Sequence, residues 1–542
     1  MESAQQRREK YPIFDTIEEI IAYTQANSSS DQILIQEAEG GSLTIGEFIS
    51  DLGRICNMFL DLGMKRDRNV GVFLPNCMEY SYLYIALGRL GIPVIPINRF
   101  LKGESLKYVL NHCDVHYLVT SKELFEEDID QFGDSLETLR HIIYIDEQVL
   151  NQSFGESSFF SDFRRYPSDF TPPWVIEGNE IQGVWMTSGT TGLPKGIVAT
   201  HKYLLQRLSF TANYFRLEPS DVIYFALPMY HQPFFNWGIT MALMGGCKLV
   251  FVERFTASRF WEHISKYKGT LVYTTGTIIP ILLKQPSGPF ETEGREFIRL
   301  WMPWPLDPGA IERWPMIKFL EGYGLSEYAI AAFNSYHNPE IGSQGPITPF
   351  TDLKICDPET SAELPNGKIG EIVVRSKLGP DYMMQGYYNS PEETERVIRD
   401  GWFYTGDAGY LDDDSLLHFS DRLKDSVRVG GENVPSLQVE AIIRKYPKIE
   451  DVAIVGVKGD LGHDEILAHV VVKEGEKLSP DEFFAFCNQD MAYYMVPMFL
   501  YIRDDLPKTA TLRVQKYKLR DEGIPPGTVK RKDTRGSKNR KK

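Results

Sequence analysis

Cysteine is scarce in this sequence and is not grouped. The 542 residues include six cysteines, and none forms a CxxC pair or a metal-type cluster with histidine. The spacing excludes a zinc ribbon and a disulfide-stapled scaffold. We expect mostly buried thiols in a reducing, cytoplasmic compartment. The six are Cys56, Cys77, Cys113, Cys247, Cys356 and Cys487.

The sequence also lacks a leader-like start and a long hydrophobic run. It begins with the polar stretch MESAQQRREKYP, which has no apolar core of the kind found in signal peptides. The longest apolar run, Trp237–Val252, is interrupted by Lys248 and is too short to cross a bilayer. We therefore expect no transmembrane segment.

Basic charge is deficient. The chain has 58 Lys and Arg against 74 Asp and Glu, for a net charge of −16. This balance excludes general binding to nucleic acid or to an anionic membrane. The exception is the tail at 529–542, where Lys530–Lys542 holds eight Lys or Arg and one Asp. Its composition predicts disorder, with either a solubilising role or a weak contact with an anionic partner.

What is present is an alternation of helical and strand patterns. Apolar residues make up 42% of the chain, enough for large cores in more than one domain. Strands that alternate with helices indicate a parallel α/β sheet. The predicted helices are 44–63, 79–91 and 105–114, and the predicted strands are 69–76, 92–98, 115–121, 222–228, 247–253 and 269–275.

The second half of the chain has a different texture. Short strands with turn-rich joints at about 345–420 predict a β-rich subdomain, without long helices between them. A compact α+β pattern follows, in which Ser479 is placed to cap a helix. We predict a large domain at 1–422 with stacked, mostly parallel sheets flanked by helices, and a small α+β domain at 423–528.

One loop stands out for chemistry. The stretch TSGTTGLPKG, Thr187–Gly196, lies between two strand-like segments, and a helix begins only later. A Walker A loop would run from Gly-Lys-Ser/Thr straight into a helix, so that motif is excluded. Small residues, hydroxyls and Lys195 still suit polyphosphate. The residues alone leave two interpretations open, a phosphate cradle and a structural loop.

Other motifs narrow the choice. The loop resembles the signature of the adenylate-forming superfamily, and further segments resemble that family's motifs in family order over roughly residues 20–525. Within the superfamily, the segments at 430–457 and 481–497 are most similar to the carnitine/crotonobetaine-CoA ligase type. The motif-like segments are LPMYHQ (227–232), YGLSE (323–327), GEIVVRS (370–376), MQGYYNSPEET (384–394), GWFYTGDAGYLD (401–412) and DRLKDSVRVGGENVPSLQVE (421–440).

The resemblance implies two half-reactions. A carboxylate attacks the α-phosphorus of ATP to give an acyl-adenylate and pyrophosphate, and the thiol of coenzyme A then displaces AMP. It also implies that the loop holds the β- and γ-phosphates, with Mg²⁺ bridging phosphate oxygens. The loop residues assigned to ATP are Thr187, Ser188, Gly189, Thr190, Thr191, Gly192 and Lys195.

The same resemblance assigns roles in the nucleotide site. Tyr323, followed by Gly324, would stack on adenine, and Ser326 would contact the α-phosphate. Glu327 would be the Mg²⁺ ligand, because a hard cation needs oxygen. Asp407 would bind the ribose hydroxyls, and Arg422 the ribose or a phosphate. Each has a plainer alternative: Tyr323 in the core, Asp407 in a turn and Arg422 in a surface ion pair.

Two positions bear on the acid. The family places an aromatic residue or histidine beside the acyl pocket where His231 stands, although a lone histidine is often structural. Where the family usually has small residues, this chain has Met-Pro-Trp-Pro, including Trp304. Because an indole is large and rigid, we predict a shortened pocket that favours small or polar acids over long fatty chains.

The last assignments concern the second half-reaction and the final motif. The resemblance implies a hinge at Lys424, a mobile small domain, and a CoA path near Gly430 and Gly431. Where the family usually has Gly-Lys, this chain has Leu512 followed by Arg513. Arg513, or Lys516 one helical turn on, would replace the lysine that bridges carboxylate and α-phosphate.

These features predict an ATP-dependent acid–CoA ligase, for which a homodimer is one option. One alternative is adenylation that loads a carrier-protein thiol supplied in trans. The other is a nucleotide-binding homologue with impaired catalysis. The missing motif lysine favours it slightly, but the intact Tyr323, Glu327, Asp407 and Arg422 argue against it.

Overall fold

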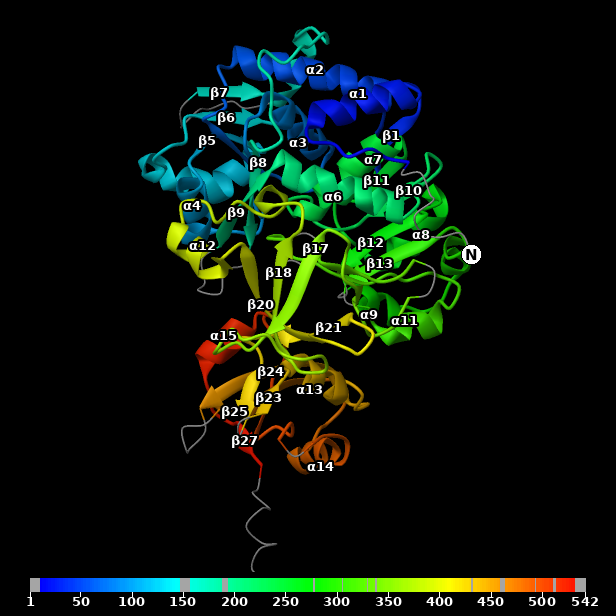
Figure 1. Cartoon of the computed structure of the whole chain (residues 1–542), viewed down its shortest axis with the longest axis vertical. Helices are drawn as coiled ribbons and strands as arrows, with labels where there is room; N and C mark the ends of the chain where they lie inside the picture. The colour runs from blue at the N-terminus through cyan, green and yellow to red at the C-terminus, as the bar shows by residue number, and fades with distance from the viewer. Residues whose placement is uncertain are drawn as a thin grey trace, which may run out of the picture. The chain divides into compact units, whose positions relative to one another are not determined.

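The computed structural model describes residues 10–146, 156–187, 194–275, 278–304, 306–328, 330–336, 339–429, 432–458, 464–492, 494–509 and 513–531 (Figure 1). The chain forms two compact units that interleave along the sequence. The first unit comprises residues 1–352 and 374–403, and the second comprises 353–373 and 404–542. The predicted linear boundary between residues 422 and 423 stays a prediction.

One sheet of the first unit has the strand order β7-β6-β5-β3-β4-β8-β9. All its neighbouring pairs are parallel except β8 with β9, which are antiparallel. Helices follow β3, β4 and other strands, as the alternating pattern predicted. The bounds are β3 (Asn69–Phe73), β4 (Val94–Pro96), β5 (Val115–Thr120), β6 (His141–Tyr144), β7 (Glu156–Phe159), β8 (Ile181–Thr187) and β9 (Lys195–Thr200).

A second sheet of this unit has the order β13-β12-β10-β11-β1-β2, with β10 to β13 drawn in green in Figure 1. Strands β13, β12, β10, β11 and β1 are mutually parallel, so their carboxyl ends share one edge. The prediction of an α/β fold with mostly parallel sheets is confirmed. The bounds are β1 (Ile33–Glu37), β2 (Ser42–Thr44), β10 (Val222–Phe225), β11 (Lys248–Phe251), β12 (Leu271–Thr275) and β13 (Leu300–Trp304).

The helices of the first unit begin at defined caps. Thr44 and Glu47 form a reciprocal capping box at the start of α2, and the Thr200 hydroxyl caps α6. The bounds are α1 (Ile17–Asn27), α2 (Ile45–Asp61), α3 (Met78–Leu90), α4 (Gly103–His112), α5 (Lys122–Leu124), α6 (His201–Tyr214), α7 (Met241–Gly245), α8 (Ala257–Tyr267), α9 (Ile278–Leu283), α10 (Pro289–Gly294), α11 (Pro308–Arg313) and α12 (Pro391–Val397).

Shorter elements complete this unit. They include a π-helix, η4, which directly precedes α7. The bounds are η1 (Phe125–Ile129), η2 (Asp130–Ser135), η3 (Phe160–Arg165), η4 (Phe234–Thr240), η5 (Pro380–Tyr382), β14 (Gly322–Tyr323), β15 (Ala332–Phe333), β16 (Gly345–Pro346) and β19 (Ile398–Arg399).

The second unit holds most of the β-rich part and the C-terminal α+β part. One sheet has neighbours in the order β21-β20-β18-β17, and another has the order β24-β25-β26-β27. The Ser479 hydroxyl caps α14 in a capping box, as predicted. The bounds are β17 (Thr351–Cys356), β18 (Gly370–Ser376), β20 (Trp402–Leu411), β21 (Leu416–Arg422), β22 (Val427–Val429), β23 (Glu432–Val434), α13 (Ser436–Ile443), β24 (Ile449–Lys458), β25 (Asp464–Val472), α14 (Pro480–Asp490), β26 (Phe499–Ile502), α15 (Lys516–Glu522) and β27 (Val529–Lys530).

A membrane-spanning helix is not found: across the described ranges, no helix is both long enough and apolar enough to cross a bilayer. None of the six cysteines forms a disulfide bond within the described ranges, and five of them are buried. Residues 532–542 of the basic tail lie outside the described residues.

Candidate active site

The glycine-rich loop connects two strands, as its flanks predicted, and the structure shows that these strands are antiparallel. Thr187 at the end of β8 is paired with Lys195 at the start of β9. The Thr187 hydroxyl donates to the Lys195 carbonyl at 3.4 Å. The assigned residues between them, Ser188, Gly189, Thr190, Thr191 and Gly192, lie outside the described residues. The strands therefore hold Thr187 and Lys195 side by side, at the two ends of the loop.

The Lys195 ammonium group has two neighbours from the segment after β18. It forms an ion pair with the Glu393 carboxylate on α12, and it lies 5.1 Å from the centre of the Tyr387 ring. The Lys195 side chain is 16% exposed. The hydrogen bond from Lys195 lowers the pKa of Glu393. The predicted phosphate-binding cation is thus already engaged by a carboxylate.

The YGLSE motif lies around strand β14. Tyr323 is buried there, and β14 pairs with β15. The Tyr387 hydroxyl donates to Glu327 Oε1 at 3.2 Å, and the Met384 amide donates to the Glu327 carbonyl at 3.1 Å. Tyr387 therefore contacts both Lys195 and Glu327. Lys195 and Glu327 stand far apart in the sequence, and in the structure both contact the Tyr387 side chain.

Helix α6 supports the same motif through two side chains. The Tyr203 hydroxyl donates to the Ser326 carbonyl at 2.5 Å. The buried Arg207 guanidinium donates to the carbonyls of Tyr328 and Tyr382 and lies 4.5 Å from the centre of the Tyr328 ring. Burial lowers the pKa of Arg207, partly offset by nearby tyrosines. Arg207 thus ties α6 to the YGLSE motif and to the segment that carries Tyr387.

Sequence reasoning assigned no role to Tyr387, Glu393 or Arg207. Tyr387 and Glu393 lie in the quoted stretch MQGYYNSPEET, but their partners are 60 and 198 residues away. Arg207 stands four residues after Tyr203, on the buried side of α6. A charged residue among apolar helix positions was the one available signal for it.

His231 follows β10 at the carboxyl edge of the second sheet. Burial lowers its pKa to about 4, so the imidazole is neutral at pH 7. Its ring lies 4.5 Å from that of Tyr230. Trp304 is the last residue of β13 and is paired with Thr275 of β12. Both assigned pocket positions therefore lie at the carboxyl ends of parallel strands, where α/β sheets bind ligands; the Trp304 side chain lies outside the described parts of the chain.

In the second unit, two assigned ribose ligands face each other. Asp407 on β20 is paired with Arg422 on β21, and Arg422 Nε lies 3.6 Å from Asp407 Oδ1. Lys424, in the turn after β21, is exposed. Desolvation and the nearby Arg422 lower the pKa of Lys424. Gly430 and Gly431 lie outside the described residues.

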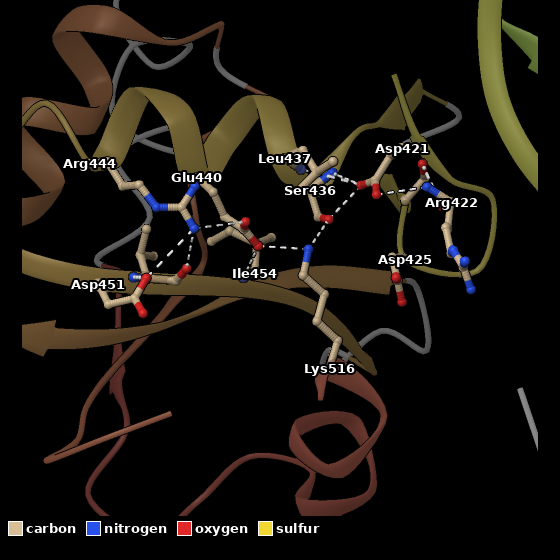
Figure 2. Close-up of polar contacts among 12 residues, drawn as sticks. Asp421, Arg422, Asp425, Ser436, Leu437, Glu440, Arg444, Asp451, Ile454 and Lys516 are labelled. Carbon is tan, nitrogen blue, oxygen red and sulfur yellow. Dashed lines mark hydrogen bonds and ion pairs between the residues drawn. The ribbon is translucent and has the colours of Figure 1, made fainter. Parts of the chain in front are cut away.

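The two candidates for the missing motif lysine have different surroundings. Lys516 Nζ lies 2.7 Å from Glu440 Oε1 and also donates to the Ser436 hydroxyl (Figure 2). The two charged side chains are only 10% and 3% exposed. Glu440 also accepts the Ile454 amide at 2.9 Å and pairs with Arg444. Lys516 is therefore part of a buried network.

Arg513 is exposed, and no ion pair of its side chain occurs among the residues that the structure describes. Desolvation by surrounding atoms and then Arg422 lower the pKa of Arg513, whereas Asp425, Asp407 and Asp421 raise it. These electrostatic effects on its pKa indicate that the Arg513 guanidinium lies near Asp407 and Arg422. Of the two cations, Arg513 is the one available to a ligand.

Comparison with known families matches most of the chain. A family model described as "AMP-binding enzyme" matches residues 22–388. A second, described as "AMP-binding enzyme C-terminal domain", matches residues 438–512. The first match covers the glycine-rich loop, His231, the YGLSE motif and Tyr387.

Individual relatives and solved structures agree. The chain is 30% identical to crotonobetaine/carnitine–CoA ligase of Proteus mirabilis over 495 residues, 89% of this chain and 94% of that protein. It is 32% identical to the enzyme of the same name from Salmonella paratyphi B over 482 residues, 87% and 91% of the two chains.

Two solved structures share the fold, each with a TM-score of 0.82. ATP-bound MatB from Rhodopseudomonas palustris is 24% identical over 93% of this chain and 98% of that one. The anthranilate CoA ligase AuaEII in complex with anthranoyl-AMP is 23% identical over 94% and 97%.

Proposed function

The chain belongs to the AMP-binding enzyme family, and from that premise we propose that it is an ATP-dependent carboxylic acid–CoA ligase. The observation that carries the proposal is the contact of Tyr387 with both Lys195 and Glu327. Tyr387 thus contacts both a cation suited to bind phosphate and a carboxylate suited to bind a divalent metal. The relatives, named for joining an acid to CoA, support the choice of acceptor.

In the first half-reaction, a carboxylate oxygen forms a bond to the α-phosphorus of ATP. The bond from that phosphorus to the bridging oxygen breaks, and pyrophosphate leaves. A carboxylate is a weak nucleophile, so positioning and charge stabilisation supply most of the catalysis. Lys195 steadies the leaving pyrophosphate, Ser326 contacts the α-phosphate, and Tyr323 stacks on adenine.

Glu327 fits a magnesium ion that is held largely by substrate. Within the described ranges, no group of three His, Cys, Asp or Glu side chains could hold a metal. Mg²⁺ commonly binds through one or two carboxylates together with phosphate oxygens and water. When bound, the ion would supply positive charge to the phosphates. Glu327 would hold it, and the Tyr387 hydroxyl fixes the Glu327 carboxylate by a hydrogen bond to Oε1.

In the second half-reaction, the CoA thiol loses its proton and its sulfur bonds to the acyl carbon, while AMP leaves. Asp407 and Arg422 hold the ribose, and Lys424 is the hinge of the mobile domain. Thioester formation would use the Gly430–Gly431 stretch for the CoA path. We also assign the enzyme to the cytoplasm, because six cysteines without a disulfide bond among the described residues suit a reducing compartment. A homodimer stays a prediction.

The test is an assay with ATP, Mg²⁺ and a panel of acids, with and without CoA. The panel holds short, hydroxylated and dicarboxylic acids, carnitine, crotonobetaine and palmitate. We expect pyrophosphate release only with acid and thioester only with CoA, and Glu327→Gln should abolish both. Adenylate without transfer to CoA would instead favour a carrier protein, and nucleotide binding without turnover an impaired homologue. Preferred use of palmitate would contradict the shortened pocket predicted from Trp304.

A second experiment concerns the Lys195–Glu393 ion pair. If ATP must displace Glu393 from Lys195, Glu393→Gln should lower KM for ATP and leave kcat nearly unchanged. A partly exposed pair is worth about 0.2–1 kcal/mol, so the decrease in KM should be at most about five-fold. The control is Glu392→Gln, which makes the same charge change at an exposed neighbour. A higher KM in Glu393→Gln would show that Glu393 holds Lys195 in its productive position.

A further inference from the structure

A short segment between β18 and α12 is added to the edge of the first sheet. Tyr387 forms an antiparallel bridge with Ile197 of β9. Backbone hydrogen bonds of 3.0 and 2.7 Å join Gly386 and Tyr388 to the same strand. Successive side chains of an extended segment point to opposite faces of a sheet. Tyr387 and Tyr388 therefore lie on opposite sides of β9.

The Tyr388 side is held by hydrogen bonds to the α4–β5 turn. The Tyr388 hydroxyl accepts from Asn69 Nδ2 at 3.0 Å and donates to Asp114 Oδ2 at 3.0 Å. The Asn389 amide donates to the same Asp114 oxygen at 3.1 Å and to the His112 carbonyl at 3.0 Å. Burial raises the pKa of Tyr388 to about 12, so the phenol stays protonated and donates at neutral pH. One carboxylate oxygen thus holds two consecutive residues.

The backbone at both ends of this contact is left-handed. Asp114 has φ +47° and Asn389 has φ +49°. Asp114 directly follows Cys113, the C-cap of α4, at the position where glycine most often ends a helix. A residue other than glycine loses stability in this conformation, and such strain is concentrated at functional positions. An aspartate where glycine would be less strained points to a role for its carboxylate.

The Tyr387 side reaches the proposed phosphate and metal ligands. The Tyr387 ring lies 5.1 Å from the Lys195 ammonium group, and its hydroxyl donates to Glu327 Oε1 at 3.2 Å. The Tyr387 amide donates to the Thr394 hydroxyl on α12 at 2.8 Å. The same helix carries Glu393, the ion-pair partner of Lys195. A displacement of Tyr388 would therefore move Tyr387 and the start of α12 together.

Building on the proposed function, we propose that Asp114 is a positioning residue for the phosphate and metal site. By holding Tyr388 and Asn389, its carboxylate fixes Tyr387 in contact with Lys195 and Glu327. Asp114 acts through this segment and not on the reacting atoms. A misplacement of about 1 Å in a site can cost about 100-fold in rate, so a small displacement of Tyr387 is measurable.

Asp114→Gly separates positioning from stability, because it removes the carboxylate and suits the left-handed backbone. The relief of strain opposes the loss of hydrogen bonds, so Tm should change little. Acid-dependent pyrophosphate release should fall about ten-fold, and the Mg²⁺ concentration for half-maximal rate should rise. Asp114→Asn keeps an oxygen that accepts both hydrogen bonds and should retain most of the rate. Tyr388→Phe should lose rate as Asp114→Gly does, and the double variant should be no slower than either, since both remove one contact.

Two matched controls make the same changes elsewhere. Asp400→Gly replaces an exposed aspartate whose φ is +51°. Tyr166→Phe removes a hydroxyl that donates to Asp61 Oδ2 at 2.7 Å. Both controls should keep the wild-type rate and the wild-type response to Mg²⁺. Equal rates in Asp114→Gly and Asp400→Gly, or full activity in Tyr388→Phe, would overturn the proposal.

Binding of ATP in the presence of Mg²⁺, measured by calorimetry, provides a readout that does not depend on turnover. Asp114→Gly should weaken this binding, whereas Asp400→Gly should not. If the wild type binds ATP but releases no pyrophosphate with any acid, the reaction assignment fails. A selective loss of affinity in Asp114→Gly would then still support the positioning role. Wild-type affinity and rate in Asp114→Gly would show that Asp114 serves only the fold.

Discussion

Replacing Arg513 by alanine is expected to slow acid-dependent pyrophosphate release by about 100-fold and to leave the folded structure intact. Removal of one group that stabilises charge in a transition state typically costs about 3 kcal/mol, which corresponds to this factor. Arg513 is exposed, so its removal leaves no buried charge behind. Arg513→Lys, which restores the residue usual in the family, should retain most of the rate. The measurement is pyrophosphate release under single-turnover conditions.

Lys516→Met should have the opposite effect to Arg513→Ala, with lower stability and a nearly unchanged rate. Its ammonium group pairs with Glu440 in a nearly dry environment. Removing one partner of a buried ion pair typically costs about 3–5 kcal/mol, so Tm should fall substantially. The rate per folded molecule should change little. Lys518→Ala, at an exposed position of the same helix, is the control for loss of a lysine. Loss of rate in Lys516→Met together with full activity in Arg513→Ala would reverse the assignment.

The sequence alone does not decide whether Arg513 or Lys516 replaces the missing motif lysine. Arg513 and Lys516 are both cations, three residues apart, and spacing alone could not choose between them. The choice depends on Glu440 and Ser436, which lie 76 and 80 residues away from Lys516 in the sequence and meet it only in the folded unit. The antiparallel β8–β9 hairpin, by contrast, was predictable, because its strands and loop are contiguous.

The same distinction holds for the phosphate site. Lys195 and Glu327 belong to motifs with recognisable residue order, so both were predicted. Tyr387 contacts both residues, yet its role follows from contacts and not from its own sequence context. The hydrogen bond between Tyr388 and Asp114 was also unpredictable, because the two residues are 274 positions apart in the sequence.

Replacing Arg207 by methionine is expected to impair both stability and catalysis. The guanidinium binds two backbone carbonyls in the protein interior. A hydrogen bond to a charged group contributes about 1.5–3 kcal/mol, so the free energy of unfolding should fall by about 3 kcal/mol or more. The Tyr328 carbonyl directly follows Glu327. Its release should also disturb the carboxylate proposed to hold magnesium.

The kinetic signature separates positioning from simple loss of stability. At a temperature where Arg207→Met is fully folded, kcat should fall about ten-fold or more and KM for Mg²⁺ should rise, with KM for the acid nearly unchanged. Arg207→Lys keeps the charge but loses the planar, forked guanidinium. It should therefore restore kcat and KM for Mg²⁺ only in part. Gln206→Met is the matched control on the same helix, because the Gln206 side chain donates to Asp15 Oδ1 at 2.5 Å, away from the motif. If Arg207→Met and Gln206→Met lose stability alike and keep the wild-type response to Mg²⁺, Arg207 supports the fold and does not position Glu327.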